Sequence, residues 1–220
     1  MTGRLAAICA HIPPSKVFAD IGCDHGYCTR YALDHGLCER AYLSDVSAAC
    51  LHKAETLLSA EIAAGRCFAV CADGLEGLPE PPDCVLCAGL GGEEIVRIFA
   101  GRELPEAFVL QPMKNTEKVR RFLIGRGAHL DYDATFSDGG KCYDLIAGRG
   151  AGGDSYSEFE YRYGRDNLKT PGHAFLAKIR RSAATARHAL RGAKETGQRE
   201  RLLAKLHELE GIADAMEEYL

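Results

Sequence analysis

Short apolar runs alternate along the first half of the chain with stretches in which apolar positions recur every three or four residues. The runs predict strands, and the periodic stretches predict helices. Strands are expected at residues 17–20, 41–45, 67–72, 84–88 and 107–110. Helices are expected at residues 4–11, 27–34, 47–60 and 116–126, with a further one between Gly92 and Phe99. This alternation is typical of an α/β fold with a mostly parallel, Rossmann-like sheet.

A different pattern follows. Residues 128–136 and 142–149, joined through Asp138-Gly-Gly-Lys141, predict a β-hairpin. After a glycine-rich joint at residues 150–154, apolar residues fall four and three apart, as in a coiled-coil seam. They are Phe175, Ile179, Ala183, Ala186 and Leu190, then Leu202, Leu206, Leu209, Ala213, Met216 and Leu220. We expect an α/β domain at residues 1–152 and, at residues 153–220, a helical domain of two antiparallel helices with a turn near residues 192–197.

Charge is distributed unevenly between these parts. The chain has 27 basic and 31 acidic residues, a net charge of −4. Between Arg162 and Lys205, however, there are 12 basic and 3 acidic residues, which leaves 15 basic and 28 acidic residues elsewhere. A basic segment beside an acidic domain indicates nucleic-acid binding, and the alternative is a solvated helix face. The candidate phosphate contacts are Arg180, Arg181, Arg187, Arg191, Lys194 and Arg199.

The first predicted strand runs into a glycine turn and a helix. Residues 17–27 read Val-Phe-Ala-Asp-Ile-Gly-Cys-Asp-His-Gly-Tyr, the order that opens a doubly wound nucleotide-binding fold. Gly22 and Gly26 are spaced G-x-x-x-G, which is not the dinucleotide fingerprint, so a dehydrogenase is not expected. Asp24 and His25 stand where a pyrophosphate would need space. Carboxylates there suit a ligand with an ammonium or sulfonium group, and S-adenosylmethionine has both.

All five predicted strands end in a polar residue or glycine, at the edge where open parallel sheets bind ligands. These residues are Asp20, Asp45, Asp73, Gly89 and Gln111. Asp45 lies where an acidic residue would accept hydrogen bonds from a ribose diol, and Asp73 could accept one from the amine of an adenine. The glycines at residues 89–92 would let the backbone pass close to a ligand. Each residue is also an ordinary turn residue, but together they favour a site for a sulfonium nucleotide.

Ten cysteines raise the question of a metal site. Cys67-x3-Cys71 and Cys84-x2-Cys87 come closest to metal-ligand spacing, but both pairs lie in apolar strand-like runs, whereas zinc knuckles place such pairs on tight turns. Period-two geometry sends Cys67 and Cys71 to one face of a strand, and Cys84 and Cys87 to opposite faces. We expect no metal, and buried free thiols in a reducing compartment.

No apolar run reaches the ~18 residues that a membrane span requires. The first residues also lack the apolar core and the small-residue cleavage site of a signal peptide. The expectation is a soluble, cytoplasmic protein, with a monomer favoured.

Several blocks of the sequence occur together in one known family. They are Ala19-Asp-Ile-Gly-Cys-Asp-His-Gly-Tyr27, Asp73-Gly-Leu75, Ala88-Gly-Leu-Gly-Gly92, Leu110-Gln-Pro112 and Gly140-Lys-Cys-Tyr143. In order and rough spacing they resemble the TrmK family, the bacterial methyltransferases that modify N1 of the adenine at position 22 of tRNA. The resemblance runs from about Leu5 to Ile146, with conservative departures at Cys23, Gly26 and Leu90.

The resemblance implies transfer of a methyl group from S-adenosylmethionine to N1 of an adenine in tRNA. Neutral adenine has a lone pair at N1, so the enzyme has mainly to hold donor and acceptor about 3–3.5 Å apart and to exclude water. The product is a cation, which a carboxylate such as Asp24 would stabilise. The target base must be unpaired or extruded. Tyr27 or Tyr143 could stack on it, while Gln111 could bind its edge and Pro112 would stiffen that loop.

The predicted site residues fall into three groups. Catalysis is assigned to Asp24, Tyr27, Gln111 and Pro112. Cofactor binding is assigned to Asp20, Gly22, Cys23, Asp24, His25, Asp45, Val46, Asp73, Gly74, Ala88, Gly89, Leu90 and Gly91. Substrate binding is assigned to Lys141, Tyr143 and the six basic residues named above. Lys141 and Tyr143 could instead only close the hairpin, and Asp24 could bind the methionine amine.

Two other functions remain open. One is an S-adenosylmethionine-dependent methyltransferase that acts on a small molecule or a protein and dimerises through its coiled coil. The other is an RNA-binding protein without catalysis. The first leaves the basic segment without a role, and the second does not explain the run of acidic strand ends.

Overall fold

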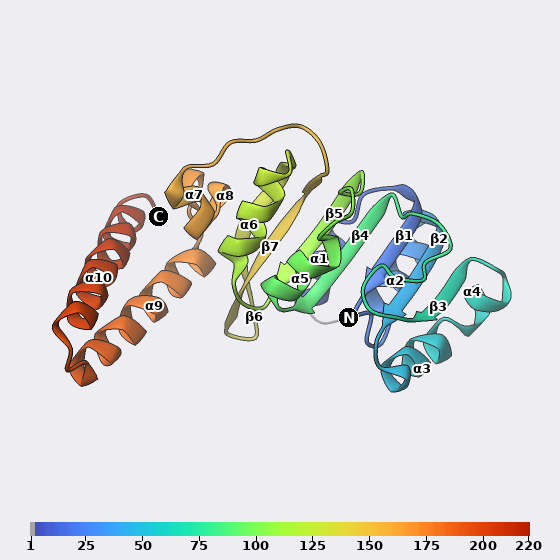
Figure 1. Cartoon of the computed structure of the whole chain (residues 1–220), viewed down its shortest axis with the longest axis horizontal. Coiled ribbons are helices and arrows are strands. Elements are labelled where there is room, and N and C mark those ends of the chain that lie inside the picture. The colour runs from blue at the N-terminus through green and yellow to red at the C-terminus, as the bar shows by residue number, and fades with distance from the viewer. Residues whose placement is uncertain (1–2) are drawn as a thin grey trace.

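A seven-stranded sheet forms the centre of the computed structural model, which describes residues 3–220 (Figure 1). Its strands are β1 (Ser15–Ile21), β2 (Cys38–Asp45), β3 (Cys67–Cys71), β4 (Cys84–Leu90), β5 (Ala107–Pro112), β6 (His129–Asp138) and β7 (Lys141–Arg149). Their order in the sheet is β3-β2-β1-β4-β5-β7-β6. The first five strands pair in parallel, and β7 runs antiparallel to both β5 and β6. The predicted sheet and its final hairpin are confirmed.

Helices cover both faces of the sheet. On one face lie α1 (Gly3–Cys9), α2 (Tyr27–Asp34) and α3 (Ala48–Leu57), and on the other lie α5 (Gly92–Phe99) and α6 (Thr116–Gly125). Alternate side chains of β4 enter alternate cores: Cys84 lies in the first and Cys87 in the second. The prediction that these two thiols point to opposite faces is confirmed. The parallel strands and the helices on both faces also confirm the predicted Rossmann-like fold.

Most predicted boundaries agree with the structure, and α2 agrees to the residue. Ser47 caps α3, since its side chain accepts a hydrogen bond from the backbone nitrogen of Cys50 at 3.3 Å. The single helix predicted over residues 47–60 is wrong, because the chain breaks at Leu58 and continues as α4 (Ser59–Ala63). Several strands are longer than predicted. β1 and β2 begin at Ser15 and Cys38, β4 includes Gly89 and Leu90, and β5 extends to Pro112.

Two long antiparallel helices end the chain, as predicted. They are α9 (His173–Gly192) and α10 (Thr196–Glu217), together called the helical arm here, and they stand at the opposite end of the molecule from β3 (Figure 1). The predicted seam is buried between them through Phe175, Ile179, Ala183, Ala186, Leu206, Leu209, Ala213 and Met216. Leu220 is an exception, because it lies beyond α10 and is 49% exposed.

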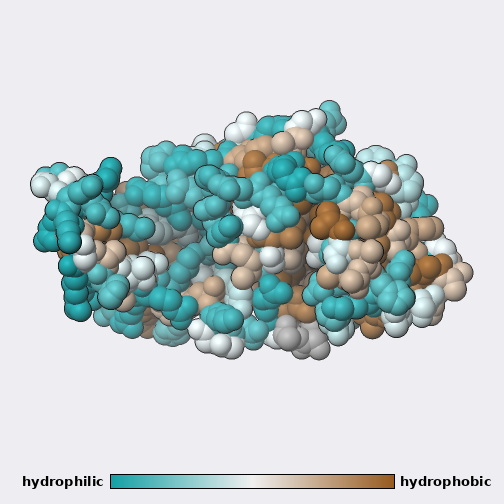
Figure 2. All heavy atoms as spheres, turned by 60° about the horizontal axis from the view of Figure 1, so that its bottom comes forward, coloured by the Kyte–Doolittle hydropathy of each residue, from teal (hydrophilic) through white to brown (hydrophobic). Residues whose placement is uncertain are grey.

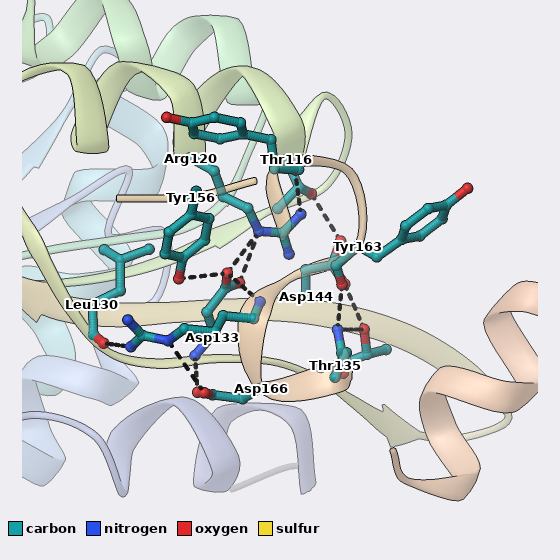
Figure 3. A network of polar contacts seen from close by, with 12 residues as sticks. Thr116, Arg120, Leu130, Asp133, Thr135, Asp144, Tyr156, Tyr163 and Asp166 are labelled. Carbon is teal, nitrogen blue, oxygen red and sulfur yellow. Dashed lines mark hydrogen bonds and ion pairs between the residues drawn. The ribbon is translucent and has the colours of Figure 1, made fainter. Parts of the chain in front are cut away.

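Two short helices that the sequence analysis did not predict join the arm to the sheet. They are α7 (Glu158–Tyr163) and α8 (Arg165–Lys169). Between them and α6 lies the buried ion pair of Arg120 with Asp133, whose Nε–O distances are 2.8 and 2.9 Å (Figure 3). The hydroxyl of Tyr156 also donates to Asp133 (3.1 Å). Removing either charge would leave the other buried and unpaired, at about 3–5 kcal/mol. The domain boundary at residues 152–153 stays a prediction, since this joint contacts both parts.

All ten cysteines are free thiols. Within residues 3–220 no group of three or more His, Cys, Asp or Glu side chains is arranged to hold a metal ion. Over the same residues, no helix is both long enough and apolar enough to cross a membrane.

Candidate cofactor site and basic cleft

Two adjoining pockets lie at the carboxyl ends of β1 and β4, where the strand order of the sheet reverses. Each encloses about 340 Å³. The β2-side pocket is lined by Ser44, Asp45, Val46, Ala72, Asp73, Gly74, Gly89, Leu90, Glu94 and Met113, among others. The α2-side pocket is lined by Asp20, Cys23, His25, Tyr27, Cys28, Asp138 and Tyr143, among others. Arg4, Gly22, Asp24 and Ala88 line both.

The structure therefore gathers the residues that were predicted to bind a cofactor. All of them line one of the two pockets except Gly91, which caps the start of α5. Tyr27 and Tyr143 line the α2-side pocket as well. Their individual roles stay predictions.

The glycine turn holds Asp24 in an unusual backbone conformation. Asp24 (φ 46°) and Asn115 (φ 57°) are the two non-glycine residues with positive φ between residues 3 and 220. Such strain gathers at functional loops, and Asp and Asn tolerate it better than other residues do. Gly22, at φ 70°, has a second constraint, because a Cβ there would come within 3.0 Å of Leu90. The turn presents the Asp24 side chain, 63% exposed, to both pockets.

The two pockets are strongly acidic. The β2-side pocket is lined by Asp24, Asp45, Asp73 and Glu94, and the α2-side pocket by Asp20, Asp24 and Asp138. Asp20 is 4% exposed and accepts a hydrogen bond from Thr29 Oγ1 at 2.8 Å. Burial outweighs that bond and raises the pKa of Asp20 to about 7. A cation bound nearby would favour the ionised form of Asp20.

Arg4 of α1 is a site residue that the sequence analysis missed. Within residues 3–220 it is the only Arg or Lys side chain lining either pocket. Its Nη1 donates to Oε1 of Gln111 at 2.9 Å, and its guanidinium carbon lies 5.7 Å from the centre of the Tyr143 ring. No local signal marks Arg4, because its position depends on how α1 packs against α2 and β6.

Two predicted contacts look different in the structure. Gln111 is fully buried and lines neither pocket: its Oε1 accepts from Arg4, and its Nε2 donates to the carbonyl oxygen of Pro112 at 3.2 Å. In this arrangement Gln111 orients Arg4, and its contact with the edge of the adenine stays a prediction. Asp73 lines its pocket, but its two oxygens are bound by Arg97 at 2.5 and 2.9 Å.

A basic cleft of about 860 Å³ lies between α6, the start of β7 and α9. Seven basic side chains and two acidic ones line it: Lys114, Lys118, Arg121, Lys141, Arg162, Lys178 and Arg181, with Glu117 and Asp144. Pro112 also lines it. The cleft adjoins the two pockets: Tyr143 lines both the cleft and the α2-side pocket, and Met113 lines both the cleft and the β2-side pocket.

Of the six arm residues predicted to bind phosphate, only Arg181 lines this cleft. Arg180 and Arg187 are instead paired with Glu217 and Glu210 of α10. Arg199 donates to carbonyl oxygens at the end of α9. Residues 206–220 contain five acidic residues and no Lys or Arg, directly after the basic segment. The predicted basic surface is therefore narrower than the sequence indicated, although the arm surface seen in Figure 2, at the left, is mostly hydrophilic.

Gly92 supports the loop between β5 and α6, and its substitution gives a first prediction. A Cβ there would lie 2.6 Å from the carbonyl oxygens of Lys114 and Asn115. Gly92→Ala is therefore expected to lower the free energy of unfolding by about 1–3 kcal/mol, measured by denaturant titration. Gly125→Ala is the control, because the space around Gly125 is open, and it should stabilise α6 by about 0.5–1 kcal/mol. Equal stability of the two variants would contradict the packing argument.

A family model described as a methyltransferase domain matches residues 1–146. The chain therefore belongs to the methyltransferase-domain family. Among curated proteins it is similar to the tRNA (adenine(22)-N(1))-methyltransferase of Bacillus subtilis, with 26% identity over 151 residues, 66% of this chain and 63% of that protein. A Mycoplasma pneumoniae protein, provisionally named a tRNA methyltransferase, is 33% identical over 136 residues, 60% of this chain and 62% of that protein. The chain thus spans somewhat under two thirds of the length of these curated relatives.

Within that family the similarity is to TrmK. The solved structure of Mycoplasma capricolum TrmK, in complex with the cofactor product S-adenosyl-homocysteine, has a TM-score of 0.88 and 18% identity, and covers 97% of this chain and 98% of that one. At this identity the likeness shows a shared fold, helical arm included. Together with the curated relatives it confirms the resemblance to TrmK that the sequence blocks indicated.

Proposed function

We propose that this protein transfers a methyl group from S-adenosylmethionine to N1 of an adenine in tRNA, at position 22 as in its Bacillus subtilis relative. One observation carries the proposal: an acidic double pocket at the switch point of the sheet shares Tyr143 and Met113 with a basic cleft. A cationic cofactor fits the first and a polyanionic substrate fits the second, so donor and acceptor would meet where the two join.

The charges of the pockets match those of S-adenosylmethionine. The cofactor supplies a methyl group on a sulfonium, and it also carries an ammonium and a carboxylate. Asp20 and Asp24 would face the two cationic groups. Asp45, whose Oδ1 is held by the backbone nitrogen of Ser47 at 2.8 Å, would accept from the ribose. The carboxylate of the cofactor needs a cationic partner. Among residues 3–220, Arg4 is the only Arg or Lys whose side chain lines either pocket.

The acceptor adenine would enter from the cleft. Tyr143 and Tyr27, both lining the α2-side pocket, offer aromatic faces on which an extruded base can stack. No proton has to leave N1 before attack, so positioning dominates the chemistry. The carboxylate of Asp24 stabilises the positive charge that develops on the methylated ring. Phosphates beside the target nucleotide would lie in the cleft, near Lys141 and Arg181.

Methylation of tRNA tests the function directly. The protein is incubated with radiolabelled S-adenosylmethionine and total tRNA, and the digested nucleosides are separated. Label in N1-methyladenosine is the expected result, and the same assay on a tRNA with guanosine at position 22 should give none. Cofactor binding without labelled tRNA would favour a small-molecule or protein acceptor. If the protein neither bound the cofactor nor labelled tRNA, the proposed enzymatic function would be wrong.

Cofactor binding is expected to depend on pH through Asp20. Its pKa is raised to about 7, and a cationic ligand binds the ionised form better. Affinity should therefore fall as the pH drops below 7, approaching tenfold per pH unit, measured by calorimetry between pH 5.5 and 7. Thr29→Val removes a hydrogen bond that lowers this pKa, so the midpoint should move to higher pH. The variant His25→Gln should keep the pH dependence of cofactor affinity. Loss of the dependence in this variant would show that it comes from the His25 imidazole and not from Asp20.

A further inference from the structure

Asp144 of β7 is bonded to α6, β6 and α9, and the basic cleft lies between α6, the start of β7 and α9. Its carboxylate, 7% exposed, accepts from Thr116 at the start of α6 (2.9 Å) and from Thr135 of β6 (2.7 Å). It is also ion-paired with Lys178 of α9, at Nζ–O distances of 2.5 and 2.6 Å. Figure 3 shows Asp144 between the two threonines. Burial acts to raise the pKa of Asp144, but the cations of Lys178 and Arg120 outweigh it and the pKa is lowered.

The walls of the cleft are carried by β7, by α6 with the loop before it, and by α9. Tyr143, shared with the α2-side pocket, immediately precedes Asp144. The loop at residues 112–115 ends at Thr116, where α6 begins. Lys178 lies one helical turn before Arg181, and both line the cleft. Arg181 also donates to the carbonyl oxygen of Gly140 at 3.1 Å, beside Lys141. The relative placement of the three walls therefore depends on the contacts of Asp144 with Thr116 and Lys178.

The attachment of the arm does not depend on Asp144 alone. The backbone nitrogen of Thr135 donates to Asn167 at 2.8 Å, and Nδ2 of Asn167 donates back to the Thr135 hydroxyl at 3.0 Å. The fully buried pair of Arg120 and Asp133 holds the same joint. These contacts fix where the chain enters the arm. From within α9, Lys178 pairs with Asp144 and Arg181 donates to the carbonyl oxygen of Gly140, and the pair with Asp144 is the one that reaches a buried group of the sheet. Loss of the Lys178 contact would thus leave α9 held to the hairpin by an exposed hydrogen bond and let it shift relative to the cleft.

We infer that Asp144 and Lys178 are positioning residues for the RNA substrate: their ion pair sets the distance of α9 from Tyr143 and from the loop at residues 112–115. The inference rests on the proposed function. Neither residue lines the two cofactor pockets. The pair therefore governs how tRNA phosphates and the target adenine are presented together, and leaves the cofactor side of the reaction untouched.

The test separates tRNA from cofactor in steady-state kinetics. The double variant Asp144→Asn with Lys178→Met removes both charges, so no buried charge is left unpaired. Its KM for tRNA should rise about tenfold, which corresponds to about 1.4 kcal/mol of binding free energy lost when α9 no longer holds its phosphate contacts in place. Its dissociation constant for S-adenosylmethionine, measured by calorimetry, and its kcat at saturating tRNA should stay within about twofold of the wild type. Lys178→Arg, which keeps the ion pair, should recover most of the tRNA affinity.

A matched control removes another ion pair that bridges strands. Arg149 and Asp131 join β7 to β6 at 3.1 Å, away from the cleft, and Arg149→Met should leave the KM for tRNA unchanged. An unchanged KM in the double variant, or a parallel loss of cofactor affinity and thermal stability, would overturn the inference. If the wild-type protein itself methylates no tRNA, the proposed function fails instead, so the two failures are distinguishable.

Discussion

Arg4→Ala is expected to weaken binding of S-adenosylmethionine by about 100-fold. Arg4 is half-buried, and a bound cofactor would bury the charge pair that it forms with the carboxylate. Truncating one partner of a buried charge pair typically removes 2–5 kcal/mol of binding free energy. The reason is the charge balance of the double pocket, where Arg4 stands among the carboxylates of Asp20, Asp24 and Asp138. Of the charged groups of the cofactor, only the methionine carboxylate should attract a guanidinium. Calorimetric titration of the wild-type protein and the variant measures the difference.

Decarboxylated S-adenosylmethionine provides the matched ligand. The wild-type protein should prefer the complete cofactor strongly, whereas Arg4→Ala should bind the two ligands almost equally. Arg4→Lys keeps the charge but loses the hydrogen bond to Gln111, so an intermediate preference is expected. If Arg4→Ala weakened the binding of both ligands by the same factor, Arg4 would be a structural residue of α1, and the methionine carboxylate of the cofactor would need another partner.

Asp24→Asn is expected to lower kcat by about 100- to 1,000-fold, the usual effect of removing one group that stabilises charge in a transition state. Asparagine also tolerates the left-handed conformation of this position (φ 46°), so the substitution removes the charge with little change in the turn. Single-turnover methylation of tRNA at saturating S-adenosylmethionine measures the rate of the methyl-transfer step.

Asp24→Ala serves as the comparison, since alanine loses the same charge and adds about 1–2 kcal/mol of backbone strain. A role in charge stabilisation predicts the same kcat for both variants, with lower stability for the alanine. A rise in the dissociation constant for S-adenosylmethionine with kcat unchanged would show instead that Asp24 binds the methionine amine. Near-wild-type turnover of both variants would remove Asp24 from the mechanism.

Local patterns predicted the elements whose sequence signal is complete within a few residues. The helix over residues 27–34 follows a glycine turn and ends before Gly36, and the seam of the arm repeats regularly, so both were placed correctly. The short helices α7 and α8 were missed because tertiary contacts hold them. One local signal for α7 was present, since Ser157 and Glu160 form a capping box.

In the site, too, the features with a local sequence signal were predicted, and those that depend on tertiary packing were not. The acidic strand ends could be gathered from the sequence because parallel strands end at one edge of the sheet. Arg4 and Gln111 could not be paired, because 107 residues separate them and only the packing of α1 brings them to 2.9 Å. Charge counting along the chain also treated Arg180 and Arg187 as free, although their partners lie across the seam on α10.

The position of β7 between β5 and β6 has a consequence during synthesis. The ribosome releases the chain from its N-terminus, so β5 emerges with one side unpaired and stays so until residue 149 has followed it. An open strand edge can pair with other chains. The β6–β7 hairpin, which forms from neighbouring residues, can then add to β5 in one step. The exposed period of a nascent chain is thus set by how quickly the last 40 or so residues of the sheet are translated, at about 5–20 residues per second.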